Sequence, residues 1–162
     1  MGSDLLSQKR VLIVDDEPDV LDTLEDLLDM CVIERAKSFD EARHLLESRP
    51  FDIAILDIMG VDGFALLDIA REKKVIPVML TGHALTPQNI VKSYQEGAAS
   101  YIPKDEIGKI AVFLGDILEA EAKGEHFWWR WFDRLGTYLE NKFGPDWKEK
   151  DKAFWERFGN WE

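Results

Sequence analysis

The sequence predicts an α/β protein whose five-stranded parallel sheet is doubly wound, with helices on both faces. Short apolar runs alternate along the chain with segments in which apolar residues recur every three or four positions. The best runs are apolar at consecutive positions, as at residues 53–56, which is typical of strands buried on both faces. Because a helical segment follows each run, we expect parallel strands joined by helical crossovers.

The individual elements follow from local signals. Pro18 suits the first turn of a helix, and Gly97 suits the residue that ends one. The second strand is the weakest, since only Val32 and Ile33 are apolar there. The expected strands are residues 11–14, 32–33, 53–56, 75–80 and 100–103. Five helices are expected. The first starts at Pro18, and the second includes residues 42–46 and ends near Pro50. The other three cover residues 64–74, 86–97 and 107–122.

Charge and cysteine content limit the classes of function. The chain of 162 residues has a net charge of −12. Residues 1–123 hold 24 acidic and 13 basic side chains, so this portion repels nucleic-acid phosphates, and we expect no nucleic-acid partner. No apolar stretch approaches the roughly 18 residues of a membrane span, and the lone Cys31 fits a reducing compartment. We therefore expect a cytoplasmic protein without a membrane partner.

Polar side chains follow four of the expected strands. They are Asp15, Asp16 and Glu17 after the first, Asp57 after the third, Thr81 after the fourth and Lys104 after the fifth. Each has a structural explanation when taken alone, such as capping the next helix. However, ligands of open parallel sheets bind beyond the carboxyl ends of the strands, so these side chains share one rim. The set as a whole favours a functional site.

The chemistry of this set fits phosphoryl transfer to an aspartate. A carboxylate such as Asp57 can act as nucleophile and hold a phosphoryl group as an acyl phosphate. Neighbouring carboxylates are suitable Mg²⁺ ligands, and the cation offsets charge on the transferring oxygens. Lys104 would add a fixed positive charge, and the Thr81 hydroxyl could donate a hydrogen bond to a phosphoryl oxygen.

The chain resembles the receiver domains of two-component response regulators over about residues 9–123. The resemblance rests on "LIVDDEPD", "IAILD", "MLTG" and "YIPKD", in that order. It implies the flavodoxin-like strand order 2-1-3-4-5. It also implies Mg²⁺ binding by Asp15 and Asp16, with Asp16 the more direct ligand. Asp57 would accept phosphate from a histidine kinase or phosphotransfer protein and bind the metal, and the backbone carbonyl of Met59 would complete the metal shell.

The same resemblance assigns the remaining site residues. Thr81 and Lys104 would contact the phosphoryl group. Tyr101, three residues before Lys104, matches the switch aromatic that turns inward as the threonine moves toward the phosphate. His83, two residues after Thr81, would influence dephosphorylation by analogy with the family.

The sequence departs from the family pattern at the loop after the acceptor. Val61 stands where a proline is usual, and Gly60 and Gly63 make the loop look about two residues short. Glycines can take the backbone angles that a tightened turn needs. Gly82 stands where alanine is commoner, and Asp105 replaces the usual proline after the lysine. Since no chemical group is lost, we expect a competent receiver with altered kinetics.

Composition changes after Gly124, which predicts a receiver domain at residues 9–123 and a helical extension at residues 124–162. All six Trp and five of nine Phe lie in this extension. Its aromatic and leucine residues fall at helical spacing on both sides of a break at Gly144 and Pro145, which predicts two antiparallel amphipathic helices. The stripes are Trp128, Trp131, Phe132, Leu135, Leu139 and Phe143, then Trp147, Phe154, Trp155, Phe158 and Trp161.

Two such helices cannot hide this aromatic surface from each other alone, and three arrangements would cover it. The helices could fold back over the receiver, form a protein interface such as a symmetric homodimer, or lie in a membrane interface. The predicted function is a phosphorylatable receiver that signals through a downstream protein partner, without a DNA-binding output domain or enzymatic activity beyond its own phosphorylation and dephosphorylation. The alternative is an adaptor or dimerisation module that works without phosphorylation.

Overall fold

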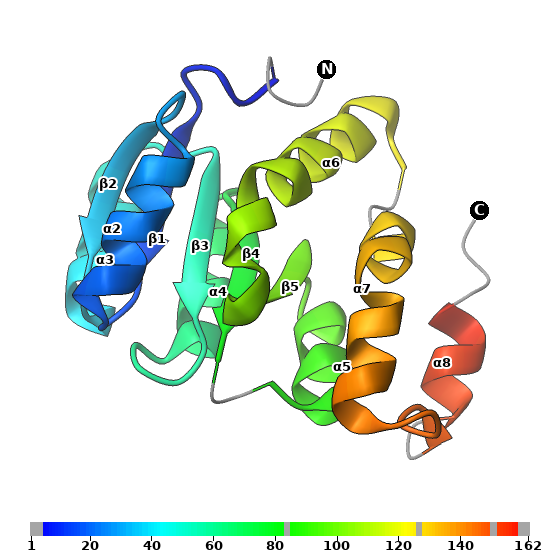
Figure 1. The fold of residues 1–162 in the computed structure, drawn as a ribbon. Coiled ribbons are helices and arrows are strands. Elements are labelled where there is room, and N and C mark those ends of the chain that lie inside the picture. The colour runs from blue at the N-terminus through cyan, green and yellow to red at the C-terminus, as the bar shows by residue number, and fades with distance from the viewer. Residues whose placement is uncertain (1–4, 83–84, 126–127, 150–151, 159–162) are drawn as a thin grey trace.

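The computed structural model describes residues 5–82, 85–125, 128–149 and 152–158. Its sheet has five parallel strands in the order β2-β1-β3-β4-β5, which confirms the predicted fold class and strand order (Figure 1). The strands are β1 (Arg10–Val14), β2 (Val32–Ala36), β3 (Ile53–Asp57), β4 (Ile76–Thr81) and β5 (Ser100–Pro103). The central strand β3 is buried at every position, as its continuous apolar run predicts.

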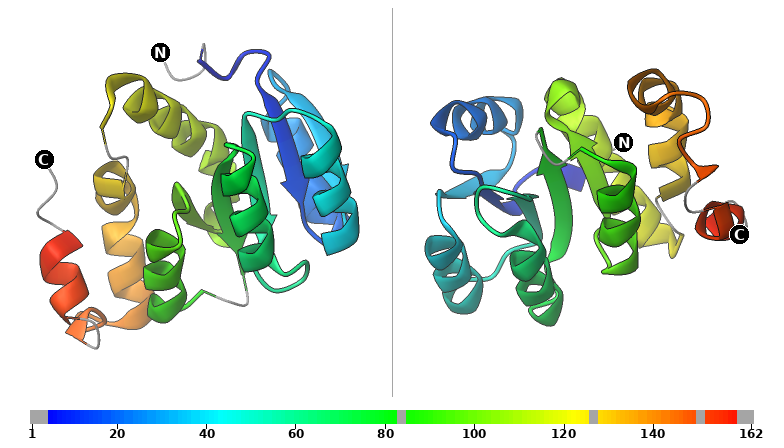
Figure 2. Two further views of the ribbon diagram at one scale, coloured as in Figure 1. Left: turned by 180° about the vertical axis from the view of Figure 1, so that it is seen from behind. Right: turned by 90° about the horizontal axis from the view of Figure 1, so that it is seen from below.

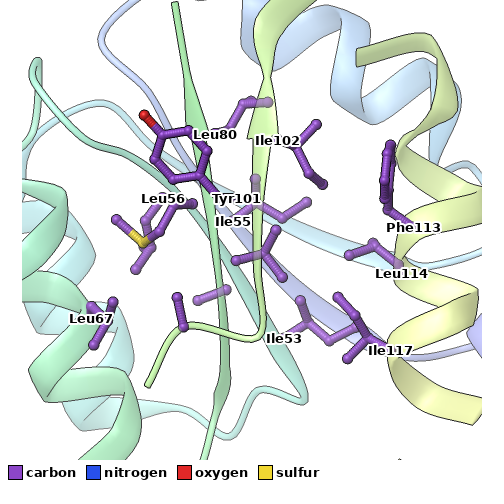
Figure 3. Close-up of a cluster of buried hydrophobic side chains, with 14 of the residues drawn as sticks. Ile53, Ile55, Leu56, Leu67, Leu80, Tyr101, Ile102, Phe113, Leu114 and Ile117 are labelled. Carbon is purple, nitrogen blue, oxygen red and sulfur yellow. The ribbon is translucent and has the colours of Figure 1, made fainter. Parts of the chain in front are cut away.

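Helices cover both faces of the sheet. The helices are α2 (Pro18–Leu27), α3 (Phe39–Ser48), α4 (Gly63–Glu72), α5 (Pro87–Gln95), α6 (Ile110–Lys123), α7 (Trp128–Phe143) and α8 (Lys152–Phe158), with a 3-10 helix η1 (Lys104–Lys109) before α6. The helices α2 and α6 lie on one face, and α3, α4 and α5 lie on the other (Figure 2). In the core, Tyr101 and Leu56 point to the side of α4, whereas Ile102 packs towards Phe113 of α6 (Figure 3).

Local signals explain where the helices begin. Pro18 occupies the first turn of α2, where its missing N–H costs no hydrogen bond. The hydroxyl of Ser38 accepts a hydrogen bond from the backbone N–H of Glu41 and so caps α3. Thr86 caps α5 in the same way through the N–H of Asn89.

Three differences from the sequence prediction are larger than the one- or two-residue shifts seen at other element boundaries. The strand β2 extends to Ala36 because it is an edge strand, on which Glu34 and Arg35 can face solvent. The helix expected from residue 107 begins at Ile110, since η1 occupies the preceding residues. The second helix of the extension begins only at Lys152. Trp161 lies outside the described residues.

The extension packs on its own receiver at the β5 edge of the sheet. Helix α7 lies beside α5, and α8 returns alongside α7 in the opposite direction (Figures 1 and 2). The rings of Trp128 in α7 and Tyr94 in α5 meet edge to face with centroids 5.4 Å apart. The guanidinium of Arg134 binds both carboxylate oxygens of Asp116 in α6. Of the three arrangements considered for the aromatic stripe, the structure therefore shows the fold-back for α7.

Candidate functional site

Side chains from three strand ends converge at the carboxyl edge of the sheet. The Nζ atom of Lys104, just after β5, lies 3.0 Å from Asp15 Oδ2 and 3.5 Å from Asp57 Oδ1. The two carboxylates are nearly inaccessible, since Asp15 is 0% and Asp57 5% exposed. The predicted rim is therefore a real cluster, in which one ammonium group bridges two buried acids.

A third acid, Glu17, completes the environment of the lysine. Its Oε1 atom accepts a hydrogen bond from Lys104 Nζ at 2.7 Å, and its backbone N–H donates to Asp15 Oδ1 at 2.9 Å. Sequence reasoning placed Glu17 on the rim but gave it no role. The only signal was its place beside the two aspartates. The structure shows it holding the lysine from the solvent side.

Burial changes the acidity of these groups. Desolvation raises the pKa of Asp15 and of Asp57 above the ordinary aspartate value, against the lowering effects of Lys104 and of backbone N–H donors. Burial lowers the pKa of Lys104, but its hydrogen bonds to Glu17 and Asp15 outweigh this, so the pKa is raised. The lysine therefore stays charged, and the carboxylates carry negative charge that a single ammonium group offsets incompletely.

Steric limits explain why glycine occupies two positions in the loop after Asp57. A Cβ atom at Gly60 would lie 2.3 Å from Asp16 Oδ1, and one at Gly63 would lie 2.3 Å from the backbone oxygen of Asp57. The N–H of Gly60 donates to Asp57 Oδ2 at 3.2 Å. Asp62 takes up the left-handed turn, with φ of 56°. The short loop thus brings its backbone close to both carboxylates, which only glycine permits at these two positions.

The acidic residues fit a divalent cation. Asp15, Asp16 and Glu17 each offer a carboxylate oxygen within 4.8 Å of the others. Among the described residues, Asp15 Oδ2 accepts no well-aligned hydrogen bond although it is buried, and Lys104 is its close neighbour. A buried carboxylate oxygen with spare capacity beside two exposed acids is the donor set that Mg²⁺ prefers. The side chain of Met59 is 68% exposed, so only its backbone could serve the site.

Thr81 and Tyr101 lie on the neighbouring strands. Thr81 is 1% exposed and ends β4, one residue beyond Leu80, which pairs with Asp57 in register. Tyr101 is fully buried in β5, and its hydroxyl accepts a hydrogen bond from the backbone N–H of Thr86. The aromatic ring is therefore in an inward position in this structure. His83 lies outside the described residues.

Sequence reasoning did not anticipate that the extension reaches this region. The indole N–H of Trp131 donates to the backbone carbonyl of Tyr101 at 2.5 Å, and the hydroxyl of Tyr138 donates to Asp105 Oδ2 at 3.1 Å. Asp105, noted as a departure from the family pattern, thus has a partner in α7. Helical spacing placed Trp131 on the apolar stripe, but no sequence signal identified the surface that receives it.

Comparison with known proteins gives one consistent family. A family model described as "Response regulator receiver domain" matches residues 11–111. The two-component response regulator ARR18 of Arabidopsis thaliana is 37% identical over 102 residues, which are 59% of this chain and 16% of that protein. The transcriptional activator protein PfeR of Pseudomonas aeruginosa is 32% identical over 105 residues, again 59% of this chain, but 32% of its own length. The chain thus spans less than a third of these curated relatives.

Solved structures agree on the fold. A CheY-like receiver domain protein from Methanospirillum hungatei has a TM-score of 0.60 and 33% identity, covering 71% of this chain and 99% of its own. A response regulator structure from Chloroflexus aurantiacus has a TM-score of 0.62 and 27% identity, covering 70% and 99%. In the part of the chain that the structure describes, no helix is long and apolar enough to cross a membrane.

Proposed function

The chain belongs to the response regulator receiver domain family of two-component signalling, and from that premise we propose that Asp57 accepts a phosphoryl group in a Mg²⁺-dependent reaction. The donor is a histidine kinase or phosphotransfer protein. The observation that carries the proposal is the position of Lys104 Nζ, 3.5 Å from Asp57 Oδ1 and 3.0 Å from Asp15 Oδ2. This places a fixed positive charge where the transferred oxygens would develop negative charge.

Asp15, Asp16 and Asp57 would hold the cation, with the backbone carbonyl of Met59 as a further ligand. When bound, Mg²⁺ supplies charge neutralisation and orientation for the transferring group. The burial of Asp15 and Asp57 and their raised pKa values support this, because a second cation relieves the negative charge that Lys104 offsets incompletely.

Asp57, Lys104 and Thr81 have separate roles in the proposed transfer. An Asp57 carboxylate oxygen bonds to phosphorus while the bond from phosphorus to the donor's leaving atom breaks, and that atom keeps the electron pair. Lys104 would leave Glu17 to pair with a phosphoryl oxygen, and the Thr81 hydroxyl would donate to another. The activity is limited to the chain's own phosphorylation and dephosphorylation, and signalling would pass to a downstream protein partner.

We propose that the receiver domain comprises residues 9–123 and that residues 124–162 form an extension with its own role. The alternative function is an adaptor that works without phosphorylation. It is favoured by the short loop after Asp57 and by the two acids that already hold Lys104. A homodimer through residues 124–162 remains a prediction.

Incubation with Mg²⁺ and acetyl phosphate tests the main proposal. We expect a base-labile phosphoryl group on the protein that is lost in Asp57→Asn and retained in Asp62→Asn. Asp62 is a suitable control because it is an exposed acid in the same loop, and asparagine tolerates its left-handed backbone. Absence of phosphorylation in the unmodified chain, or its persistence in Asp57→Asn, would leave the adaptor alternative.

A further inference from the structure

Tyr101 links helix α7 of the extension to the segment that follows Thr81. Its hydroxyl accepts a hydrogen bond from the backbone N–H of Thr86, five residues after Thr81. Its carbonyl receives the indole N–H of Trp131. Because both aromatic side chains are fully buried, neither can turn away without opening the packing between β5 and α7. Docked α7 therefore favours one arrangement of β5 and of Thr86, which Tyr101 contacts.

A second contact reaches the residue beside the lysine. Two helical turns after Trp131, the hydroxyl of Tyr138 donates to Asp105 Oδ2. Asp105 is the second residue of η1, which follows β5, and its backbone is bonded directly to Lys104. Burial and this hydrogen bond raise the pKa of Tyr138 to about 12, so its hydroxyl keeps the proton that it donates. The contact therefore persists at neutral pH and limits the freedom of the backbone that carries Lys104.

β5 needs such support because it is an edge strand. It pairs with β4 on one side only, and it is four residues long. The indole N–H of Trp131 donates to the backbone carbonyl of Tyr101 within this strand, whereas that of Trp128 donates to Ala98, which lies outside it. Without α7, the strand end and η1 would be held mainly by β4 and α6. Edge strands with few partners sample more arrangements than central strands do.

We propose that α7 is a positioning element for the phosphoacceptor site, in which Trp131 and Tyr138 hold β5 and the following turn so that Lys104 stays against Asp57. The inference rests on the proposed function. When α7 is docked, β5 and Lys104 are already ordered, so a phosphoryl group loses less binding free energy to ordering them. The docked helix therefore strengthens phosphoryl binding at the site. Linkage is reciprocal, so a phosphoryl group on Asp57 tightens α7 on the receiver by the same factor rather than releasing it.

A purely structural role for α7 makes a different prediction. If α7 only adds buried surface, every loss of an α7 contact lowers the stability of the fold, and none changes the affinity of the site specifically. Trp128 and Trp131 separate the two cases because each gives one indole N–H to a backbone carbonyl from the same helix. Only Trp131 reaches the strand residue that is tied to the loop after Thr81.

The experiment titrates the full chain with beryllofluoride, a phosphoryl mimic, in the presence of Mg²⁺. We expect Trp131→Phe and Tyr138→Phe each to weaken beryllofluoride binding by about threefold to tenfold, the amount expected for one lost hydrogen bond. Trp128→Phe should leave the affinity within about twofold of the unmodified chain. Circular dichroism identifies any variant that fails to fold. Tyr138→Phe keeps the test decisive in that event, because Tyr138 is only half-buried.

Tryptophan fluorescence supplies the reciprocal measurement, since all six Trp lie within residues 124–162. Beryllofluoride should change this emission in the unmodified chain and not in Asp57→Asn. Equal weakening by Trp128→Phe and Trp131→Phe, or binding seen by ¹⁹F NMR with no change in emission, would overturn the role of α7 while leaving the proposed function intact. Absence of beryllofluoride binding to the unmodified chain would instead reject the proposed function, and the inference with it.

Discussion

At the scale of single residues, the candidate site holds more negative charge than its one lysine can balance. Asp15 and Asp57 are buried, and Lys104 is shared between them and Glu17. An acid whose pKa is raised on folding carries a free-energy cost at neutral pH, because its ionised form is less stable in the fold than in the unfolded chain. The two buried acids therefore lower the stability of the fold, a cost that the proposed cation would offset.

Replacement of the acceptor should accordingly stabilise the metal-free protein. We expect Asp57→Asn to raise the free energy of unfolding by on the order of 1 kcal/mol, or about 2–4 °C in the melting temperature, because a buried charge is removed. Added Mg²⁺ should raise the melting temperature of the unmodified chain more than that of the variant. Asp68→Asn, an exposed acid of α4, serves as the control and should change neither value. A destabilised Asp57→Asn variant would show that the carboxylate contributes to the fold instead.

Gly60, which packs against the Asp16 carboxylate, should affect metal affinity only because it leaves room for that carboxylate. In Gly60→Ala, the new Cβ would meet Asp16 Oδ1 at 2.3 Å, so the carboxylate must move. We expect Mg²⁺ affinity, measured by calorimetry, to fall roughly 10- to 100-fold, as it does when a ligand loses its orientation. Gly108→Ala is the matched control, since its Cβ would meet nothing within 4 Å. Unchanged affinity in Gly60→Ala would exclude Asp16 as a direct ligand.

At the scale of elements, sequence patterns predicted what local chemistry determines. The strand β3, predicted at residues 53–56, and the start of α2 at Pro18 were predicted because continuous apolar runs and proline act locally. The shared rim of reactive residues followed from the parallel sheet, whereas their order along it came from the resemblance to receiver domains. The extent of β2 was missed because an edge strand tolerates polar residues. The roles of Glu17 and of Trp131 depend on contacts between segments that are distant in the sequence. Local sequence patterns do not reveal such contacts.

The ion pair between α7 and α6 should show an asymmetry set by exposure. Asp116 has a side chain 10% exposed, whereas that of Arg134 is 42% exposed. Arg134→Ala leaves a mostly buried carboxylate without its guanidinium, so we expect a loss of about 1–2 kcal/mol in the free energy of unfolding by urea. Asp116→Ala leaves an arginine that water can reach, and should cost less than about 1 kcal/mol. The double variant should resemble Asp116→Ala, and equal costs for the two single variants would contradict this account.

At the scale of the whole molecule, the extension completes the receiver's core. Trp131, Leu135 and Leu139 of α7 are fully buried. Among the described residues, the large apolar side chains that remain exposed are scattered over three sites, Val32, Met59 and Val112. The described side chains of the α7 stripe, which first suggested self-association, are thus largely buried within one chain. We infer that receiver and α7 share one cooperative core and not two independent ones.

That shared core predicts a single unfolding transition, and the placement of the tryptophans makes it measurable. Tryptophan fluorescence reports only on residues 124–162, while far-ultraviolet circular dichroism is dominated by the receiver's helices and sheet. We expect the two urea transitions to coincide, which is the behaviour of a two-state unit. Leu135→Ala should lower both midpoints together, by about 2–5 kcal/mol in free energy, because it opens a cavity between α7 and the receiver. Val112→Ala, at a site 46% exposed, is the control and should shift neither by as much. A fluorescence transition at lower urea than the circular dichroism transition would mean that α7 leaves a receiver that stays folded, and the rigid support inferred for Lys104 would then be lost.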